Sequence, residues 1–285
     1  MKIHNIGGRS FVYSEIKRSL IRNAFIISDD SQSDVQNKIV KAINLEAESK
    51  EWIIPKADFY FIWSSQADPA ACELRPKETR FVNVDKTKEL IDVISTMGGR
   101  IIYPSSNLVF SGEEPFVSSE TPTAPRNEYA RQKVEVENHL MDKYSDRGHY
   151  IFRMPKIWSW RAKFYQRWER ERKEGIPIRV STNRMVSPII PSTIVDFLNH
   201  AIHNLNPHES KILNLGNSFE VSYSEMAKSI YKIRNINNVV FEEFIDYTSS
   251  PSGLIHNSLL SSFELGQQSE QEFWSVVART LDEQS

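Results

Sequence analysis

Short apolar runs alternate with amphipathic segments over the first 155 residues, and this alternation limits the folds that the chain can adopt. The apolar runs are rich in β-branched and aromatic residues, and they predict buried strands. The predicted strands are residues 2–6, 24–28, 57–65, 99–106 and 149–155. The segments between them have helical spacing, at residues 14–23, 33–49, 79–98 and 127–145. Strands that alternate with helices predict βαβ units, and therefore an α/β fold with a doubly wound, Rossmann-like parallel sheet.

The elements become shorter and more mixed after Pro155. We expect an aromatic and basic helix within residues 158–180, helices at 192–202 and 223–233, and a late strand at 211–216. Ser222 and Glu225 have the spacing of a capping box at the start of the 223–233 helix. The second half therefore predicts a smaller, mixed α/β C-terminal domain built onto the sheet.

The six Lys or Arg residues from Arg161 to Lys173 allow two interpretations. Because Glu residues are interleaved with them, they fit an ordinary solvated helix face. The same residues at the rim of a cleft would attract a phosphorylated ligand.

The bulk composition excludes several classes of protein. A formal net charge of −2 gives no global attraction to nucleic acid or to an anionic membrane. Cys72 is the only cysteine, so the chain offers neither a disulfide nor a cysteine-based metal site, and we expect no metal. No apolar stretch reaches about 18 residues and no long apolar run opens the chain, so we expect a cytoplasmic protein.

The strongest chemical signal lies between residues 104 and 133. Ser106 ends a predicted strand, at the edge where open α/β sheets place their ligands. Tyr129 and Lys133 stand four residues apart on a predicted helix and share one face. A nearby ammonium lowers the pKa of a tyrosine from its usual value of about 10, so Tyr129 can exchange a proton with an alcohol or ketone during hydride transfer. The spacing alone is weak evidence, since an exposed Tyr beside a solvated Lys has it by chance.

The surrounding residues strengthen this interpretation. SSNLVFSG at 105–112 is followed by SSETPTAPRNEYARQK at 118–133, and the pattern resembles the extended short-chain dehydrogenase/reductase family, in particular its dTDP-4-dehydrorhamnose reductase branch. Further segments resemble the branch in the expected order, at residues 63–87, 152–158, 183–202, 212–230 and 255–264. The resemblance implies an NAD(P)-dependent oxidoreductase of sugar-nucleotide metabolism, with a role in polysaccharide biosynthesis.

The resemblance also assigns roles to individual residues. The catalytic residues would be Ser106, Tyr129 and Lys133. The cofactor-binding residues would be Gly7, Arg9, Ser10, Phe11, Val12, Asp29, Ser64, Ser65, Gln66, Asn83 and Met154. The substrate-binding residues would be Asn107, Lys156, Trp158 and Arg184, with Trp160 as a further candidate. Residues 1–155, joined by about 186–217, would form the NAD(P)-binding Rossmann domain, and residues 156–285 the smaller substrate-binding region. The residues that depart from the branch's usual ones are Ser64, Ser65, Ala130 and Pro155.

The stretch IHNIGGRSFVYSEI at 3–16 has the outline of a dinucleotide-binding turn. If Gly7 is the first glycine of the pattern, Ser10 and Tyr13 occupy the second and third positions. The second glycine normally lets the backbone approach the pyrophosphate, and the third lets the helix pack closely on the sheet. Tyr13 is a poor fit there unless the helix is shifted outward. The N–H groups at the start of the helix remain able to bind an anion.

The choice between NAD and NADP stays open on the residues alone. Asp29 or Asp30 follows the second strand, where an acidic residue binds the ribose hydroxyls of NAD. Arg9 precedes the second glycine position, where a basic residue can meet the 2′-phosphate of NADP. The resemblance favours NADP, because reductive steps on sugar nucleotides often use it in this family.

Two functions of different classes fit these residues. The first is an NAD(P)H-dependent reductase of a nucleotide-linked keto-sugar, with Tyr129 as the general acid. Dehydration is disfavoured, since Ser106, Asn107 and Leu108 lack the acidic pair usual in dehydratases. The second is a catalytically inactive regulatory or scaffolding subunit with the reductase fold, suggested by the substituted glycine turn. A homodimer is common in the family, and the expected partner is a nucleotide-sugar substrate.

Overall fold

A six-stranded parallel sheet runs through the larger part of the molecule. The computed structural model describes residues 2–8, 10–21, 26–29, 45–46, 48–204, 206–246, 255–262 and 268–282. The strand order is β2-β1-β3-β4-β5-β8. These strands are β1 (Lys2–Ile6), β2 (Ile26–Asp29), β3 (Phe59–Ile62), β4 (Arg100–Ser106), β5 (Tyr150–Met154) and β8 (Lys211–Asn214). The predicted α/β fold with a parallel sheet is confirmed, and the late strand predicted at 211–216 is the sixth member of the sheet.

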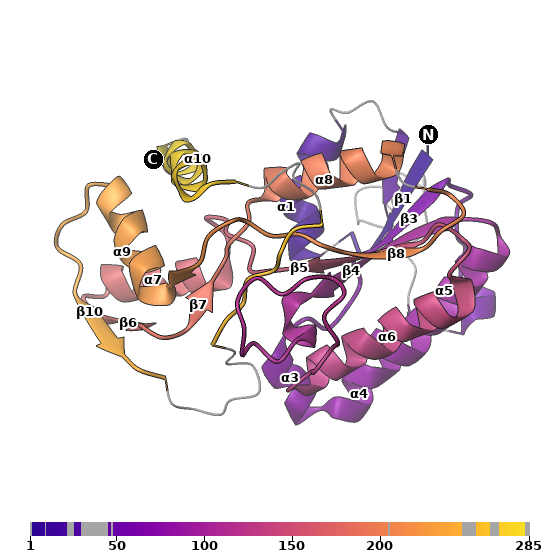
Figure 1. Cartoon of the computed structure of the whole chain (residues 1–285), viewed down its shortest axis with the longest axis horizontal. Coiled ribbons are helices and arrows are strands. Elements are labelled where there is room, and N and C mark those ends of the chain that lie inside the picture. The colour runs from indigo at the N-terminus through magenta and orange to yellow at the C-terminus, as the bar shows by residue number, and fades with distance from the viewer. Residues whose placement is uncertain are drawn as a thin grey trace.

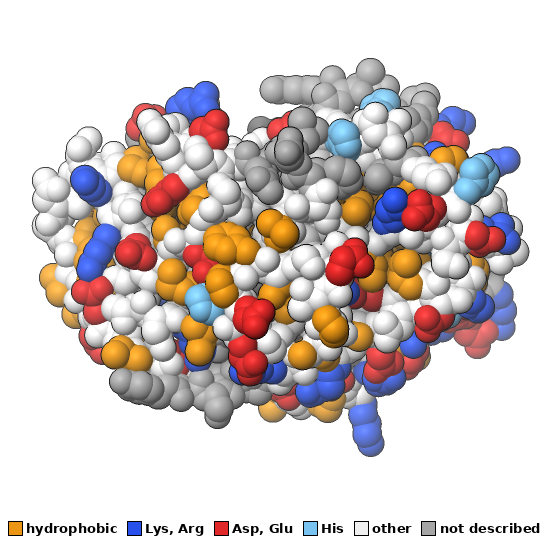
Figure 2. All heavy atoms as spheres, in the orientation of Figure 1, with side chains coloured by type: hydrophobic (Ala, Val, Ile, Leu, Met, Phe, Trp, Pro, Cys, Tyr) orange, Lys and Arg blue, Asp and Glu red, His pale blue; other side chains and the backbone are white. Residues whose placement is uncertain are grey.

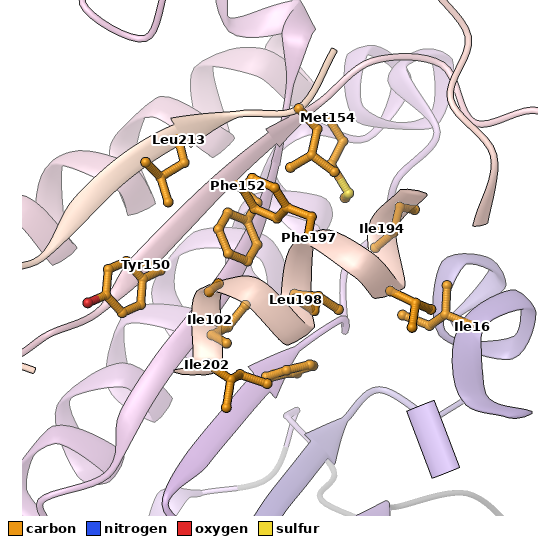
Figure 3. Close-up of a cluster of buried hydrophobic side chains, with 14 of the residues drawn as sticks. Ile16, Ile102, Tyr150, Phe152, Met154, Ile194, Phe197, Leu198, Ile202 and Leu213 are labelled. Atoms are coloured by element: carbon orange, nitrogen blue, oxygen red, sulfur yellow. The ribbon is translucent and has the colours of Figure 1, made fainter. Parts of the chain in front are cut away.

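Helices cover both faces of the sheet (Figure 1). One face carries α1 (Phe11–Ile21) and α8 (Pro191–Asn204). The other carries α3 (Pro69–Leu74), α4 (Pro76–Arg80), α5 (Thr87–Thr96) and α6 (Glu128–Tyr144). The side chains of β3 alternate between these faces, since Phe59 and Phe61 join the core beneath α8, and Tyr60 and Ile62 join the core beneath α5 and α6. Figure 3 shows the first of these cores, with Phe152 and Met154 of β5 pointing toward Ile194 and Phe197 of α8.

The smaller part of the molecule has a core of its own. It contains α7 (Lys163–Lys173), β6 (Ile178–Ser181), β7 (Met185–Val186), β9 (Val221–Ser222), α9 (Tyr223–Ile233), β10 (Phe241–Phe244) and α10 (Glu270–Asp282). β6 pairs with β10 in parallel, and β7 pairs with β9 in antiparallel. Trp158, Trp168, Ile230 and Phe273 lie buried between these elements. The predicted capping box is confirmed, because Ser222 and Glu225 bond each other's backbone N–H groups at the start of α9.

Two stretches differ from simple helices. Most of the helix predicted at 33–49 lies outside the described residues, and its described end contains a turn at 45–46 and the start of η1 (Ser49–Glu51), a 3₁₀ turn. The helix predicted at 79–98 is continuous from α4 to α5 but passes through a π-helical turn, η2 (Phe81–Lys86). π turns inside helices are uncommon and often occur at functional sites. Within the described residues, no helix is both long enough and apolar enough to cross a membrane.

Tyr13 is accommodated in the core despite its size. Its side chain is 0 % exposed and stacks on Trp63 at the end of β3, with 6.4 Å between ring centres. The Trp63 indole N–H donates to Asn5 Oδ1 at 2.9 Å, which fixes the ring over the sheet. The sequence predicts a poor fit at this position unless the helix is shifted outward. The structure accommodates Tyr13 with an aromatic pair that fills the space between α1 and the sheet.

The turn between β1 and α1 packs directly on the segment that follows β3. Gly7 has φ +93°, and a Cβ at this position would lie 2.4 Å from the backbone N of Ser64. Gly98, after α5, has a similar φ of +76°, but a Cβ there would meet no other atom within 4 Å. The two glycines therefore share the same backbone requirement and differ in the space around them.

We expect Gly7→Ala to destabilise the protein more than Gly98→Ala. Both substitutions incur the left-handed backbone penalty of about 1–2 kcal/mol, and only Gly7→Ala adds an overpacking cost of about 1–3 kcal/mol. Urea unfolding of the two variants measures the difference. Equal losses in the free energy of unfolding would show that the turn does not pack on Ser64 as described.

Candidate active site

Several of the predicted catalytic and cofactor-binding residues lie at the carboxyl edge of the sheet. The turn after β1, the segment after β3, the end of β4 and the end of β5 all reach this edge, since the strands are parallel and adjacent. β1 is flanked by β2 on one side and by β3 on the other, so the chain reverses its direction of travel across the sheet between them. Open α/β sheets bind ligands at such a switch point.

The β1–α1 turn has the features of an anion site. Ser10 N–H donates to the Gly7 carbonyl at 2.8 Å, and α1 begins at the next residue, Phe11, which is partly exposed, followed by half-buried Val12. The first turn of α1 contains no acidic residue. Its leading N–H groups have no partners within the helix, so the turn can bind an anion. Arg9 and the Asp29 side chain lie outside the described residues, and Asp29 is placed only by its backbone pairing with Asn5.

The segment after β3 is held by the side chain of Asn83. Ser64 and Ser65 are half-buried and Gln66 is exposed. Asn83 is buried, accepts from the Gln66 backbone N–H at 2.7 Å, and donates to the Gln66 carbonyl at 3.1 Å. Both backbone groups of Gln66 are therefore fixed by one amide side chain.

Lys133 ties α6 to β4. Asn127 caps α6 by accepting from the Ala130 N–H at 2.8 Å. One turn further on, the buried Lys133 amino group donates to the Pro104 carbonyl at 2.9 Å and lies 4.5 Å from the centre of the Tyr103 ring. Burial lowers the pKa of Lys133 to about 8, although the Glu137 carboxylate opposes the shift.

Tyr129 lies on the same face of α6. Its ring centre is 5.7 Å from the Lys133 amino group, and its hydroxyl has no hydrogen-bond partner among the described residues. Burial raises the pKa of Tyr129 above its usual value, and nearby Cys72 adds to the rise. The sequence predicts a lowered pKa. That prediction is wrong in direction, because loss of water around the buried phenol is the main influence on its pKa.

Ser106 ends β4 and starts the 3₁₀ turn η3 (Asn107–Val109). Its hydroxyl accepts from the Leu108 N–H at 3.2 Å and donates to Asn107 Oδ1 at 3.3 Å. The Asn107 amide N–H₂ in turn donates to the Asn257 carbonyl at 3.0 Å and to Asn257 Oδ1 at 2.9 Å. Asn107 therefore joins the end of β4 to the 255–262 segment. On the neighbouring strand β5, Met154 pairs with Ser106 and is buried in the core.

The substrate-binding candidates have different environments. Lys156 is exposed, with its amino group 5.6 Å from the Phe164 ring centre, and Trp160 is partly exposed. Arg184 is buried, and its Nε donates to Asp246 at 3.0 Å. Trp158 is 1 % exposed within the core of the smaller part. The indole of Trp158 is therefore enclosed by the core of the smaller part in this arrangement.

Sequence reasoning missed a buried ion pair behind α6. Arg153 on β5 donates to Glu137 with Nη2–Oε2 at 2.7 Å, and its Nη1 donates to the Ser119 carbonyl at 3.1 Å. The sequence spacing could have pointed to Glu137, because it stands four residues after Lys133 and so lies on the same face of the helix. This pair holds the 110–127 loop against the sheet beside Ser106.

The basic residues of α7 match the solvated-face interpretation. Arg167 pairs with Glu171 and Arg172 pairs with Glu169, while Arg161, just before the helix, pairs with Glu15 of α1. Figure 2 shows basic and acidic side chains interspersed over the face in view rather than gathered by sign. No group of three or more His, Cys, Asp or Glu side chains that could hold a metal occurs within the described part of the chain.

Comparisons with known proteins agree with this geometry. A sequence model of the family described as RmlD substrate binding domain matches residues 1–252. No curated protein sequence gives a significant match.

Solved structures of low sequence identity share the fold. A dTDP-4-dehydrorhamnose reductase from Bacillus anthracis in complex with NADP has a TM-score of 0.79 and 16 % identity, over 99 % of this chain and 98 % of that one. A dTDP-4-dehydrorhamnose reductase from Clostridium acetobutylicum has a TM-score of 0.82 and 17 % identity, over 100 % and 99 %. A UDP-glucose 4-epimerase with UDP-glucose from Thermotoga maritima has a TM-score of 0.78 and 16 % identity, over 100 % and 99 %.

The family match covers most of the chain, and the sheet order and carboxyl-edge residues have the arrangement that the fold requires. The chain therefore belongs to the RmlD substrate-binding-domain family.

Proposed function

We propose that this protein is an NAD(P)H-dependent reductase of a nucleotide-linked keto-sugar, with Tyr129 as the general acid. The observation that carries the proposal is the buried pair of Tyr129 and Lys133 on α6, fixed by the Pro104 carbonyl two residues before Ser106. Reduction of a ketone can use a proton donor, a cation that stabilises the donor's anion, and a hydroxyl that holds the carbonyl oxygen. Tyr129, Lys133 and Ser106 provide these groups beside the edge of the sheet where ligands bind.

Each of the three side chains has a distinct task. When bound, a reduced nicotinamide supplies a hydride to the carbonyl carbon. Tyr129, whose raised pKa keeps its hydroxyl protonated, donates that proton to the carbonyl oxygen. Ser106 orients the same oxygen through a hydrogen bond, and the Lys133 ammonium stabilises the phenolate that remains on Tyr129.

The carboxyl edge fits a nicotinamide dinucleotide. The turn at Gly7 leaves no room for a Cβ, and the start of α1 presents its leading N–H groups to a pyrophosphate. We assign the cofactor to the residues named from the sequence: Gly7, Arg9, Ser10, Phe11, Val12, Asp29, Ser64, Ser65, Gln66, Asn83 and Met154. NADP is the preferred form, in line with the NADP complex of the B. anthracis reductase.

The proposed substrate class is supported by the similar structures. Two of the similar structures are dTDP-4-dehydrorhamnose reductases and a third holds UDP-glucose, so a keto-sugar on a nucleoside diphosphate is the expected substrate. We assign cofactor binding to residues 1–155 with about 186–217, and substrate binding to 156–285 with Asn107, Lys156 and Arg184. A cytoplasmic homodimer is the expected assembly.

Replacing the proposed acid tests this mechanism. Tyr129→Phe is expected to bind NADPH like the wild type, because the ring is kept, and to reduce the keto-sugar about 10²–10⁴-fold more slowly, because the proton donor is lost. Tyr144→Phe, at the far end of α6, is the matched control and should keep wild-type turnover. NADPH titration by fluorescence and initial rates measure the two effects. Turnover of Tyr129→Phe within a few-fold of wild type would remove Tyr129 as the acid.

The same titration separates this function from a non-catalytic one. Micromolar binding of NADPH or NADH is expected. Failure of both cofactors to bind at millimolar concentration would favour the inactive regulatory or scaffolding subunit, as the substitutions Ser10 and Tyr13 suggest.

The charge on Lys133 predicts a pH dependence. Because the pKa of Lys133 in the free protein is about 8, its ammonium form is lost as the pH rises through that value. We therefore expect kcat/KM for reduction to fall above about pH 8, since this ratio reports ionisations of the free enzyme. A profile of kcat/KM against pH checks this. A ratio that stays constant to about pH 10 would show that the Lys133 charge is not required.

A further inference from the structure

A chain of buried amide and hydroxyl groups connects the segment after β3 with α6. It begins at the backbone of Gln66, which Asn83 holds through both its N–H and its carbonyl. The second N–H of the Asn83 amide donates to Gln132 Oε1 at 2.8 Å. Gln132, a residue for which the sequence predicts no role, therefore contacts the group that fixes Gln66.

The orientation of the Gln132 amide is determined by its partners. Its Nε2 donates to Thr79 Oγ1 at 3.1 Å and to Glu128 Oε1 at 3.1 Å. Thr79 in turn donates its hydroxyl proton to the Arg75 carbonyl at 3.1 Å, so its oxygen accepts from Gln132. If the Gln132 amide were flipped, its N–H₂ would face the N–H₂ of Asn83, and its oxygen would face the carboxylate of Glu128. The side chain is 1 % exposed, so its partners cannot readily be replaced by bulk water.

The position of this chain along α6 links it to Tyr129 and Lys133. Gln132 directly precedes Lys133, and Glu128 directly precedes Tyr129. Consecutive helical residues are about 100° apart, so Gln132 and Glu128 form a face beside the one that carries the other two. The π turn η2 places Asn83 against this face, since Asn83 lies within it.

We propose that Gln132 is a positioning residue that holds the segment 64–66 in register with Tyr129 and Lys133. The inference rests on the proposed function, in which 64–66 lines the cofactor and α6 carries the acid. An apolar side chain of similar size would fill the same buried space, but it would remove the bond at 2.8 Å that orients the Asn83 amide from the α6 side and so weaken its hold on Gln66. Gln132 touches neither cofactor nor substrate and acts through Asn83.

Gln132→Met tests the link, because it keeps the volume of the side chain and removes its hydrogen bonds. The matched control is Thr79→Val, which removes one bond from the same Gln132 amide and leaves the Asn83–Gln132 bond intact. Amide hydrogen exchange of the 64–67 backbone, measured without cofactor, is expected to accelerate about tenfold in Gln132→Met and to stay at the wild-type rate in Thr79→Val. Equal exchange in the two variants, whether fast or slow, would overturn the proposal.

Kinetics distinguish positioning from a loss of stability. Gln132→Met is expected to raise the KM for NADPH and to lower kcat, each by about tenfold, while Thr79→Val lowers stability without moving either constant. If Gln132→Met does not fold, Gln132→Ser is the substitute variant. The smaller Ser side chain leaves space for a water molecule, which can hydrogen-bond to the buried groups that lose the Gln132 amide.

The two proposals can fail separately. A wild-type protein that binds no nicotinamide cofactor would refute the proposed function, and the exchange comparison would still decide whether Gln132 holds the 64–66 backbone. A wild type that binds NADPH together with unchanged exchange in Gln132→Met would refute only the role of Gln132.

Discussion

The hydrogen bond from the buried Lys133 amino group to the Pro104 carbonyl joins the two elements on which the site depends. It fixes the register of α6 against the end of β4, and with it the position of Tyr129 relative to Ser106. Burying an ammonium is costly, and the pKa of about 8 reflects that cost. The structure offsets it with a carbonyl, the faces of two tyrosine rings and the carboxylate of Glu137. A charge kept in such a place is better explained by chemistry than by stability.

The β1–α1 turn keeps only the first glycine of the dinucleotide-binding pattern, with Ser10 and Tyr13 at the other two positions. Gly7 is retained where the backbone of Ser64 leaves no room for a side chain. The third glycine position is filled by Tyr13, and the space that it requires is shared with Trp63, an aromatic residue at the end of β3. The two substitutions are complementary, because each ring buries the other. An aromatic stack thus fills the space between α1 and the sheet, where the pattern has a small residue.

The sequence predicted the parallel sheet, the helices on both faces and the grouping of Gly7, Ser106 and Met154 at one edge, because alternating hydrophobic periods determine the order of elements. It did not predict the raised pKa of Tyr129, which depends on how many neighbouring chains exclude water from one ring. Burial of Trp158 and the ion pair of Arg184 with Asp246 were missed for the same reason, since partners so distant in sequence are set by tertiary packing. The link between Asn83 and Gln132 depends on a π turn, for which the sequence has no recognised signal.

Transfer of deuterium from NADPH tests the central claim most directly. The wild-type protein would be mixed with NADPH deuterated at C4 of the nicotinamide and with a 4-keto-sugar linked to dTDP or UDP, and the product analysed by mass spectrometry and NMR. Reduction by the proposed route places deuterium on the carbon that carried the ketone, at a rate that Tyr129→Phe lowers about 10²–10⁴-fold. Tight binding of NADPH with no deuterium transferred to either sugar nucleotide would contradict the assignment of this protein as a keto-sugar reductase.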